Sequence, residues 1–217
     1  GVARAHARSR GERTRGPGSP RGARALLRDR VTIALTAFFA LQSAGFYATL
    51  SWLPSIFHSH GASTAEGGLL LGLSMLVGLV TTLTVPGLAT RLHDQRLLAA
   101  VFTAVTAIGW LGILIAPMSA PALWAVVLGL GQNACFPLIL TMIVLRGANV
   151  GTTAALSTVV QAIGYLLAAL SPVGIGLLHD LSGSWAPPVI ALLALLAIQL
   201  PAGMVAGNAR TVSLPDG

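Results

Sequence analysis

Charged residues are scarce in this chain of 217 residues, at 9% of the sequence, whereas soluble domains carry roughly 25%. Apolar residues make up 54%, and the mean hydropathy is +0.80. A soluble domain of ordinary design cannot bury that much apolar surface, so this class is excluded. The long apolar runs between short polar breaks indicate a helical membrane protein instead.

Lysine is absent, and cysteine occurs once, as Cys135, which excludes an intramolecular disulfide. Nine of the 13 basic residues precede Val31, so the formal net charge of +7 describes a tail rather than one face of a fold. This segment, residues 1–30, is rich in Arg, Gly, Ser and Pro, and we expect a disordered cytoplasmic arm or a remnant of a central loop. It contains no aromatic residue to stack on a base, and we expect no nucleic-acid partner.

Six apolar runs of membrane-spanning length follow the arm, each near the ~20 residues that a bilayer requires. Strand-like alternation is absent, and lone strands in lipid would leave backbone groups unpaired, so the runs are predicted to be helices. The predicted fold class is an all-α membrane protein, with a six-helix transmembrane domain over residues 31–207 and a cytoplasmic tail over residues 208–217. The predicted spans are residues 31–52, 67–90, 97–116, 122–145, 152–178 and 187–205.

The arginines outside the arm predict an orientation. If the arm lies in the cytoplasm, the inside segments contain Arg91, Arg96, Arg146 and Arg210, and the predicted outside loops contain no arginine. This distribution obeys the positive-inside rule. We therefore expect a multi-pass protein of the cell membrane, surrounded by the lipid bilayer, with both termini cytoplasmic.

Two spans end on the same pattern, G-x7-P-x6-H-D. The pattern starts at Gly78 and passes Pro86 in the second span, and it starts at Gly164 and passes Pro172 in the fifth. His and Asp are scarce here, and these two spans cross the membrane in opposite directions. The match therefore indicates three helices followed by an inverted copy, a 3+3 inverted repeat. The alternative is coincidence, in which glycine and proline only allow kinks and close helix packing.

No charged residue lies well inside a predicted span, so no internal carboxylate relay is visible. The neutral polar residues gather in the first, fourth and fifth spans, where Ser157, Gln161 and Tyr165 share one helix face. We expect a polar cavity for a small polar or anionic solute. Its predicted lining residues are Gln42, Tyr47, Gln132, Asn133, Ser157, Gln161 and Tyr165. The alternative for each residue is a hydrogen bond between helices.

The loop between the second and third spans carries Arg91, Asp94 and Arg96. These charges can form ion pairs that hold a cytoplasmic gate shut. For Arg96, and equally for Arg146 at the end of the fourth span, the alternative is a role in anchoring the topology alone.

Six spans also suit an intramembrane protease, which needs a serine and a histidine inside its spans. Every histidine of this chain lies in a loop or in the arm. We therefore expect no enzyme activity, and the sequence indicates no metal ligands and no cofactor. A non-transporting membrane scaffold, or a degenerate transporter remnant, stays a second hypothesis.

Three stretches are more specific than generic membrane sequence: YATLSWLPSIF (Tyr47–Phe57), GLGQNACFPLILTMIVLR (Gly129–Arg146) and LSTVVQAIGYLLAALSPVGIGLLHDLSGSW (Leu156–Trp185). They resemble the C-terminal half of the cyanate and 2-nitroimidazole permease branch of the major facilitator superfamily. The resemblance implies that the six spans are helices seven to twelve of a secondary transporter that works by alternating access. It implies a six-helix N-terminal half as partner, and small solutes that are often anionic or nitro-aromatic. Arg91 departs from the family pattern, because an acid is usual at its place in the loop after helix eight.

Overall fold

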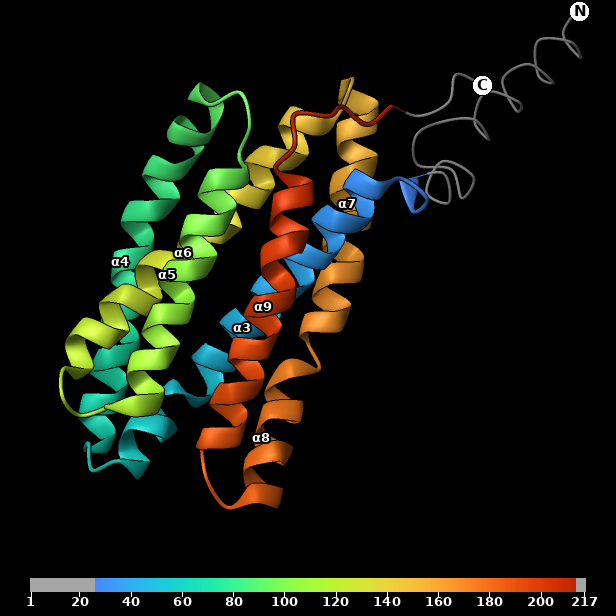
Figure 1. The fold of residues 1–217 in the computed structure, drawn as a ribbon. Helices are drawn as coiled ribbons and strands as arrows, with labels where there is room; N and C mark the ends of the chain where they lie inside the picture. Colours follow the sequence, from blue (N-terminus) through green and yellow to red (C-terminus); the bar gives the residue numbers. More distant parts are fainter. Residues whose placement is uncertain (1–25, 214–217) are drawn as a thin grey trace, which may run out of the picture.

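The computed structural model describes residues 26–213. Most of the predicted arm (residues 1–25) and the end of the predicted tail (residues 214–217) lie outside the described residues. Six helical segments are long and apolar enough to cross a membrane, and Figure 1 shows them side by side as a bundle. The all-α membrane fold expected from the sequence is confirmed.

The spanning segments follow one another in chain order. The first three are α3 (Arg30–Ser59), α4 (Thr64–Arg91) and α5 (Arg96–Ile115). The fourth is α6 (Pro121–Arg146), the fifth is divided into α7 (Val150–Ala168) and α8 (Ser171–Ser182), and the sixth is α9 (Ala186–Ala206).

Helix α3 continues beyond Trp52, where the sequence predicted the end of the first span, and it contains Pro54 in its interior. Proline removes one hydrogen bond of the helical ladder. The helix persists because Leu53, Ile56 and Phe57 are all buried in one apolar cluster with residues from α5, α6, α8 and α9. Tertiary burial therefore outweighs the local break that proline predicts.

Side chains cap three of the helix starts. In the first turn of α3, Asp29 accepts hydrogen bonds from the backbone N–H groups of Val31 and Thr32, and in the first turn of α7, Asn149 accepts one from Thr152. At α4, Ser63 and Glu66 form a capping box, each accepting from the other's backbone N–H over 3.2 and 2.7 Å. Such caps satisfy N–H groups that have no partner within the helix.

The packing of the helices has the symmetry of the repeat. α4 packs on α6 as α7 packs on α3, and α5 packs on α6 as α9 packs on α3. Exchanging α3 with α6, α4 with α7–α8, and α5 with α9 therefore maps each set of contacts onto the other. The first helix of each triplet, α3 or α6, is the one that contacts helices of the opposite triplet on several sides.

The core has an apolar cluster toward each end of the bundle and buried polar side chains between them. One cluster contains Phe38, Ala99 and Ile139, and the other contains Ala48 and Trp110. Six of the buried polar residues lie at or near the level where the two clusters meet. We call these residues the polar layer: Gln42, Thr49, Thr103, Thr106, Gln132 and Gln199. Their level near the middle of the spans is where lipid offers no hydrogen-bond partner.

The ends of α4, α6 and α9 meet around Arg146, which is only 4% exposed. Its guanidinium donates to the carbonyl oxygens of Ala206 and Gly207, over 3.3 and 2.9 Å, and to the side-chain oxygen of Gln95. The Gln95 amide in turn donates to two carbonyl oxygens at the end of α4, over 2.9 and 3.0 Å. One arginine thus joins the last carbonyl groups of two helices, directly at α9 and through Gln95 at α4.

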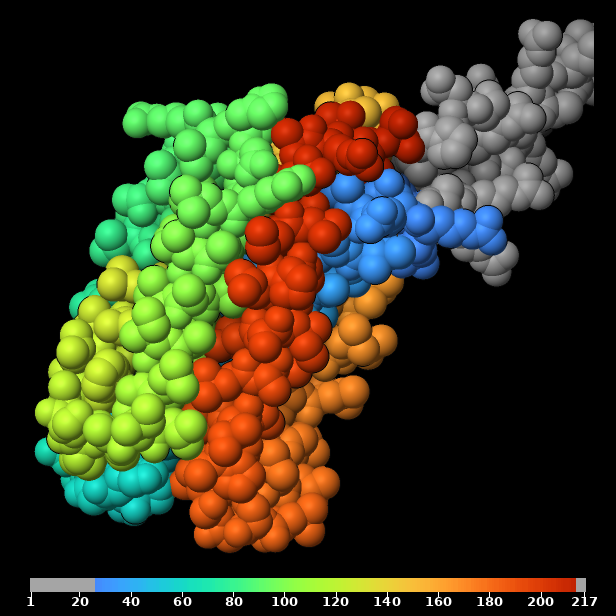
Figure 2. Space-filling model, viewed as in Figure 1, coloured from blue at the N-terminus to red at the C-terminus, as the bar shows by residue number. Residues whose placement is uncertain are grey.

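We call this the arginine end, because α3 begins there, α4, α6 and α9 end there, and Arg91, Arg96 and Arg146 lie there. The chain after α9 stays at this end. Val212 is buried, and its backbone pairs with residues 146 and 148 over 2.7 and 3.1 Å. Figure 2 shows this segment (dark red) beside the start of α3 (blue).

The network predicts that replacement of Arg146 by glutamine destabilises the chain. Hydrogen bonds of a charged group each contribute about 1.5–3 kcal/mol, and glutamine is too short to reach the same carbonyls. We expect a lower melting temperature for Arg146→Gln in detergent, followed by tryptophan fluorescence. The matched control is Arg91→Gln, since Arg91 is exposed at the same end, and it should melt like the unchanged chain. Equal melting temperatures for both variants would contradict the structural role of Arg146.

Candidate solute-binding site

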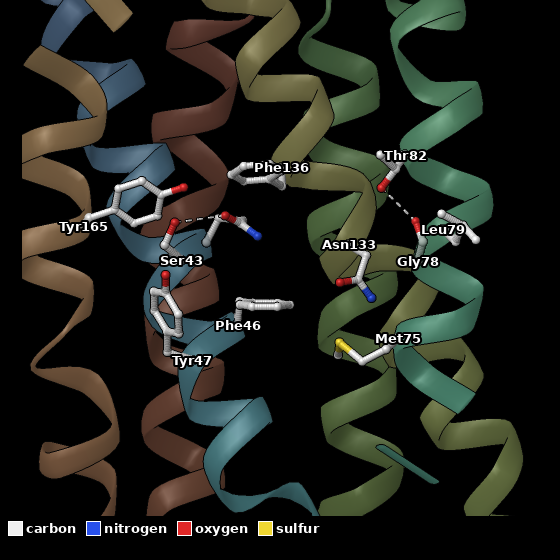
Figure 3. A pocket seen from close by; sticks show the side chains of 11 residues that line it. Ser43, Phe46, Tyr47, Met75, Gly78, Leu79, Thr82, Asn133, Phe136 and Tyr165 are labelled. Carbon is white, nitrogen blue, oxygen red and sulfur yellow. Dashed lines mark hydrogen bonds between the residues drawn. The ribbon is translucent and has the colours of Figure 1, made fainter. Parts of the chain in front are cut away.

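A cavity of about 370 Å³ opens between α3, α4, α6 and α7, at the level of the polar layer. Figure 3 shows its walls, with Ser43, Tyr47 and Tyr165 on one side and Asn133, Met75 and Thr82 on the other. The full set of lining residues is Gln42, Ser43, Phe46, Tyr47, Met75, Gly78, Leu79, Thr82, Asn133, Phe136 and Tyr165. Every one of them is uncharged, which agrees with the high free-energy cost of placing a charged side chain inside the bilayer.

Four aromatic rings form much of the wall: Phe46, Tyr47, Phe136 and Tyr165. Phe46 and Tyr47 are in edge contact, with ring centroids 5.7 Å apart, and Tyr165 lies 6.5 Å from Tyr47. Phe39, behind the wall, meets Tyr165 edge-on at 4.9 Å. Rings in such tilted and edge-on arrangements attract one another and hold their positions, so this cavity offers fixed aromatic faces.

Asn133 is the polar residue with the most closely defined position in the cavity. Its amide nitrogen donates to the carbonyl oxygen of Ser74 in α4, over 3.1 Å, and to that of Gly129 in its own helix, over 3.0 Å. Gly78 makes room for it, since a methyl group at position 78 would lie 2.5 Å from the side chain of Asn133. The missing side chain of Gly78 thus lets α4 pack directly against this amide.

Gln42 and Gln132 lie next to each other, but only Gln42 reaches the cavity. The Gln42 amide donates to the backbone oxygen of Gln132 over 3.4 Å and accepts from Ser43 over 3.2 Å. Gln132 is buried, and its amide donates over 3.0 Å to the hydroxyl of Thr49, which donates to a carbonyl of α3. Gln132 therefore bonds α3 to α6 behind the wall.

The structure divides the residues that the sequence proposed for the solute pathway. Gln42, Tyr47, Asn133 and Tyr165 line the cavity, and Gln132 lies behind it. Ser157 and Gln161 lie two turns and one turn before Tyr165 on α7, outside the lining set, and the Gln161 amide donates to the Ser157 hydroxyl over 2.5 Å.

Sequence reasoning overlooked the aromatic and apolar part of the wall. Phe46 lies four residues after Gln42, and Phe136 lies three residues after Asn133, spacings that place each pair on one helix face. Thr82 follows Gly78 by the same four-residue step. Extending the polar positions Gln42 and Asn133, and the repeat position Gly78, by one helical turn would have found these three residues.

The repeated glycines and prolines have unequal roles. A methyl group at Gly164 would lie 2.4 Å from the ring of Phe39, so α7 packs closely on α3 there. Helix α4 runs unbroken through Pro86, whereas the fifth span is interrupted at residues 169–170, directly before Ser171 and Pro172.

Two hydrogen bonds tie this interruption to α3. The hydroxyl of Ser171 donates to the carbonyl oxygen of Ala44, and the indole N–H of Trp52 donates to the carbonyl oxygen of Pro172, both over 2.8 Å. These bonds hold the start of α8 against α3, and they give the polar side-chain groups of Ser171 and Trp52 the partners that lipid does not offer.

In the loop between α4 and α5, only some of the charged side chains take part in ion pairs or hydrogen bonds. Asp94 accepts from the backbone N–H of Arg96 over 2.9 Å, and their side chains approach to 3.4 Å, each about 40% exposed. An exposed ion pair of this kind contributes roughly 0–1 kcal/mol. Arg91 is exposed and forms no ion pair within residues 26–213. In the same range, no three His, Cys, Asp or Glu side chains are grouped to hold a metal ion.

Comparison with known proteins gives the family. The model of the Major Facilitator Superfamily matches residues 2–169. The chain belongs to the Major Facilitator Superfamily. This confirms the resemblance seen in the sequence and agrees with the six spanning helices.

Three curated relatives of this superfamily member are transporters by name. The chain is 34% identical to the 2-nitroimidazole transporter of Escherichia coli over 87% of its length, and 32% identical to that organism's cyanate transport protein CynX over 76%. It is 38% identical to the uncharacterized transporter YycB of Bacillus subtilis over 82%. These alignments cover 48%, 44% and 44% of the respective relatives, so the chain spans about half the length of the proteins it matches.

The fit of Gly78 against Asn133 predicts opposite effects for two glycine replacements on α4. Gly72→Ala should be neutral or slightly stabilising, because nothing lies within 4 Å of the added methyl group and alanine favours helix by about 0.5–1 kcal/mol. Gly78→Ala should lower the melting temperature, because it displaces the Asn133 side chain from Ser74. Thermal unfolding of both variants in one detergent measures this, and a Gly78→Ala variant as stable as Gly72→Ala would contradict the contact.

Proposed function

We propose that the chain is the C-terminal half of a secondary transporter, which binds a small solute in this cavity and works by alternating access with a six-helix N-terminal half. The observation that carries the proposal is the uncharged, aromatic-walled cavity at mid-membrane level. In transporters built from inverted repeats, the solute site lies at that level, between the repeats. A non-transporting scaffold, the other hypothesis, has no need of such a cavity.

The exposed surface around the cavity supports a partner half. Leu79 is part of the wall, and Leu76 and Leu83, one turn before and after it on α4, are 65% and 75% exposed. Across the opening on α7, Leu166 is 73% exposed beside Tyr165. Apolar faces of this kind pack against other spanning helices or against lipid. The chain aligns to about half the length of its relatives. This share favours spanning helices of a partner half, rather than lipid alone, as what covers these apolar faces.

The aromatic rings favour a planar solute. A cavity of about 370 Å³ suits a ring-sized molecule, since ligand pockets typically measure roughly 300–1,000 Å³. Stacked or edge-on contacts with fixed rings favour aromatic ligands. Of the solutes named for the relatives, 2-nitroimidazole fits this wall better than the small cyanate ion. We therefore propose a nitro-aromatic or related aromatic solute.

The arginine end is proposed to face the cytoplasm, in the cell membrane, by the positive-inside rule. In that orientation the loop with Arg91, Asp94 and Arg96 lies at the inner side of the cavity. A role for these charges in an inner gate requires partners on the N-terminal half, because the Asp94–Arg96 pair stays within the loop.

The proposal predicts binding without transport for the chain alone. Purified chain in nanodiscs should bind 2-nitroimidazole, measured by isothermal titration calorimetry. Proteoliposomes containing it should take up no more labelled 2-nitroimidazole than empty liposomes, because a single half cannot alternate access. Joining the chain to the six N-terminal helices of the E. coli relative should give uptake. Uptake by the chain alone, or no binding at all, would contradict the proposal.

A matched pair of variants tests the site. Tyr165→Leu removes one ring of the wall and should weaken binding by roughly threefold to tenfold, as expected for one aromatic contact. Ile190→Ala alters an exposed position of α9 away from the cavity and should leave the dissociation constant unchanged. Equal affinities for the two variants would place the solute elsewhere.

A further inference from the structure

The side chain of Asn133 presents only one kind of hydrogen-bonding group to the cavity. An asparagine amide has two N–H donors and one oxygen acceptor. Both donors are engaged, one by the carbonyl oxygen of Ser74 at 3.1 Å and one by that of Gly129 at 3.0 Å. The atom that remains is the side-chain oxygen, Oδ1.

The orientation of this amide is determined by its surroundings. Turning it over would place Oδ1 against two carbonyl oxygens, with no hydrogen atom between them, and would leave the two N–H groups without these acceptors. The backbone of Gly78 packs closely against the Asn133 side chain, so the amide has no room to shift toward α4. Figure 3 shows the oxygen (red) turned toward the cavity and the nitrogen (blue) turned away from it.

Oδ1 of Asn133 receives no hydrogen bond from any group within residues 26–213. The other polar groups of the wall are more adaptable. The hydroxyls of Ser43 and Thr82 donate to the side-chain oxygen of Gln42 and to the carbonyl oxygen of Gly78. A hydroxyl can rotate, however, so these two groups and the hydroxyls of Tyr47 and Tyr165 can each donate to a solute or accept from it. Asn133 differs from them, because both of its N–H groups are held by carbonyl oxygens and its amide cannot turn over.

We propose that Asn133 is the specificity-determining residue of the cavity, and that its Oδ1 accepts a hydrogen bond from an N–H or O–H group of the solute. The inference rests on the proposed function, because it requires the cavity to be the solute site. The solute class is then a neutral, planar aromatic molecule that carries a ring N–H or a hydroxyl group. The deprotonated form of such a molecule lacks the hydrogen atom and brings a negative charge to an acceptor, in a wall without a cation.

A set of three related solutes tests the inference on the unmodified chain in nanodiscs. The reference is 2-nitroimidazole, which carries a ring N–H. In 1-methyl-2-nitroimidazole a methyl group replaces that hydrogen, whereas its isomer 4-methyl-2-nitroimidazole has the same added volume and keeps the N–H. Calorimetry should give similar affinities for the reference and the 4-methyl compound. The 1-methyl compound should bind about 5- to 100-fold more weakly, the range for leaving a buried acceptor unpaired.

A variant on α6 attributes the discrimination to one residue. Asn133→Leu, similar in size but without the acceptor, should bind all three solutes with similar weak affinity. Val144→Ala changes an exposed position of the same helix and should keep the discrimination. If Asn133→Leu does not fold, the three solutes on the unmodified chain still decide the question.

The outcomes separate this inference from the proposed function. Weak binding of the 1-methyl compound alone supports both. Equal binding of all three solutes overturns the role of Asn133 and leaves the cavity as the solute site. Persistent discrimination in Asn133→Leu also overturns it. Binding of none overturns the proposed site and this inference together.

Discussion

A polar group inside the bilayer has to find its hydrogen-bond partner within the protein, because the hydrocarbon offers none. In this chain, that requirement organises the centre of the bundle. Gln132 is satisfied by Thr49, and Gln199 donates to Thr103. The N–H groups of Asn133 are satisfied by two carbonyls, which holds α4 against α6. The same bonds that hold the helices together thus determine which polar atoms face the cavity without a partner, and they fix the orientation of those atoms.

The inverted repeat explains why this arrangement has two sides with different chemistry. Each triplet contributes a glycine on its second helix, Gly78 or Gly164, at the point of close approach to the first helix of the other triplet. On one side the space is filled by the amide of Asn133, and on the other by the ring of Phe39, which supports Tyr165. One backbone solution, used twice, therefore places a directional acceptor on one wall of the cavity and an aromatic face on the other.

Hydropathy was sufficient to predict six helices, because bilayer thickness and the cost of charges act on the sequence directly. The inverted order was predicted from the repeated G-x7-P-x6-H-D pattern together with the opposite directions of its two spans. These sequence signals were insufficient where a contact with another helix determines the local structure. Pro86 and Pro172 occupy matching places in the pattern, yet only the span of Pro172 is interrupted, where hydrogen bonds from Ser171 to Ala44 and from Trp52 to Pro172 join α8 to α3. The central role of Arg146 depends on where α9 ends, which no local pattern reveals.

The central claim, that the cavity between α3, α4, α6 and α7 holds the solute, can be tested by cysteine labelling. The native Cys135 is fully buried, so a new cysteine dominates the reaction with N-ethylmaleimide. Thr82→Cys places the thiol on the cavity wall, and Thr84→Cys places it at an exposed position of the same helix outside the lining set. The account predicts that 2-nitroimidazole slows labelling at position 82 and leaves position 84 unchanged. Equal labelling rates at position 82 with and without saturating solute would contradict it.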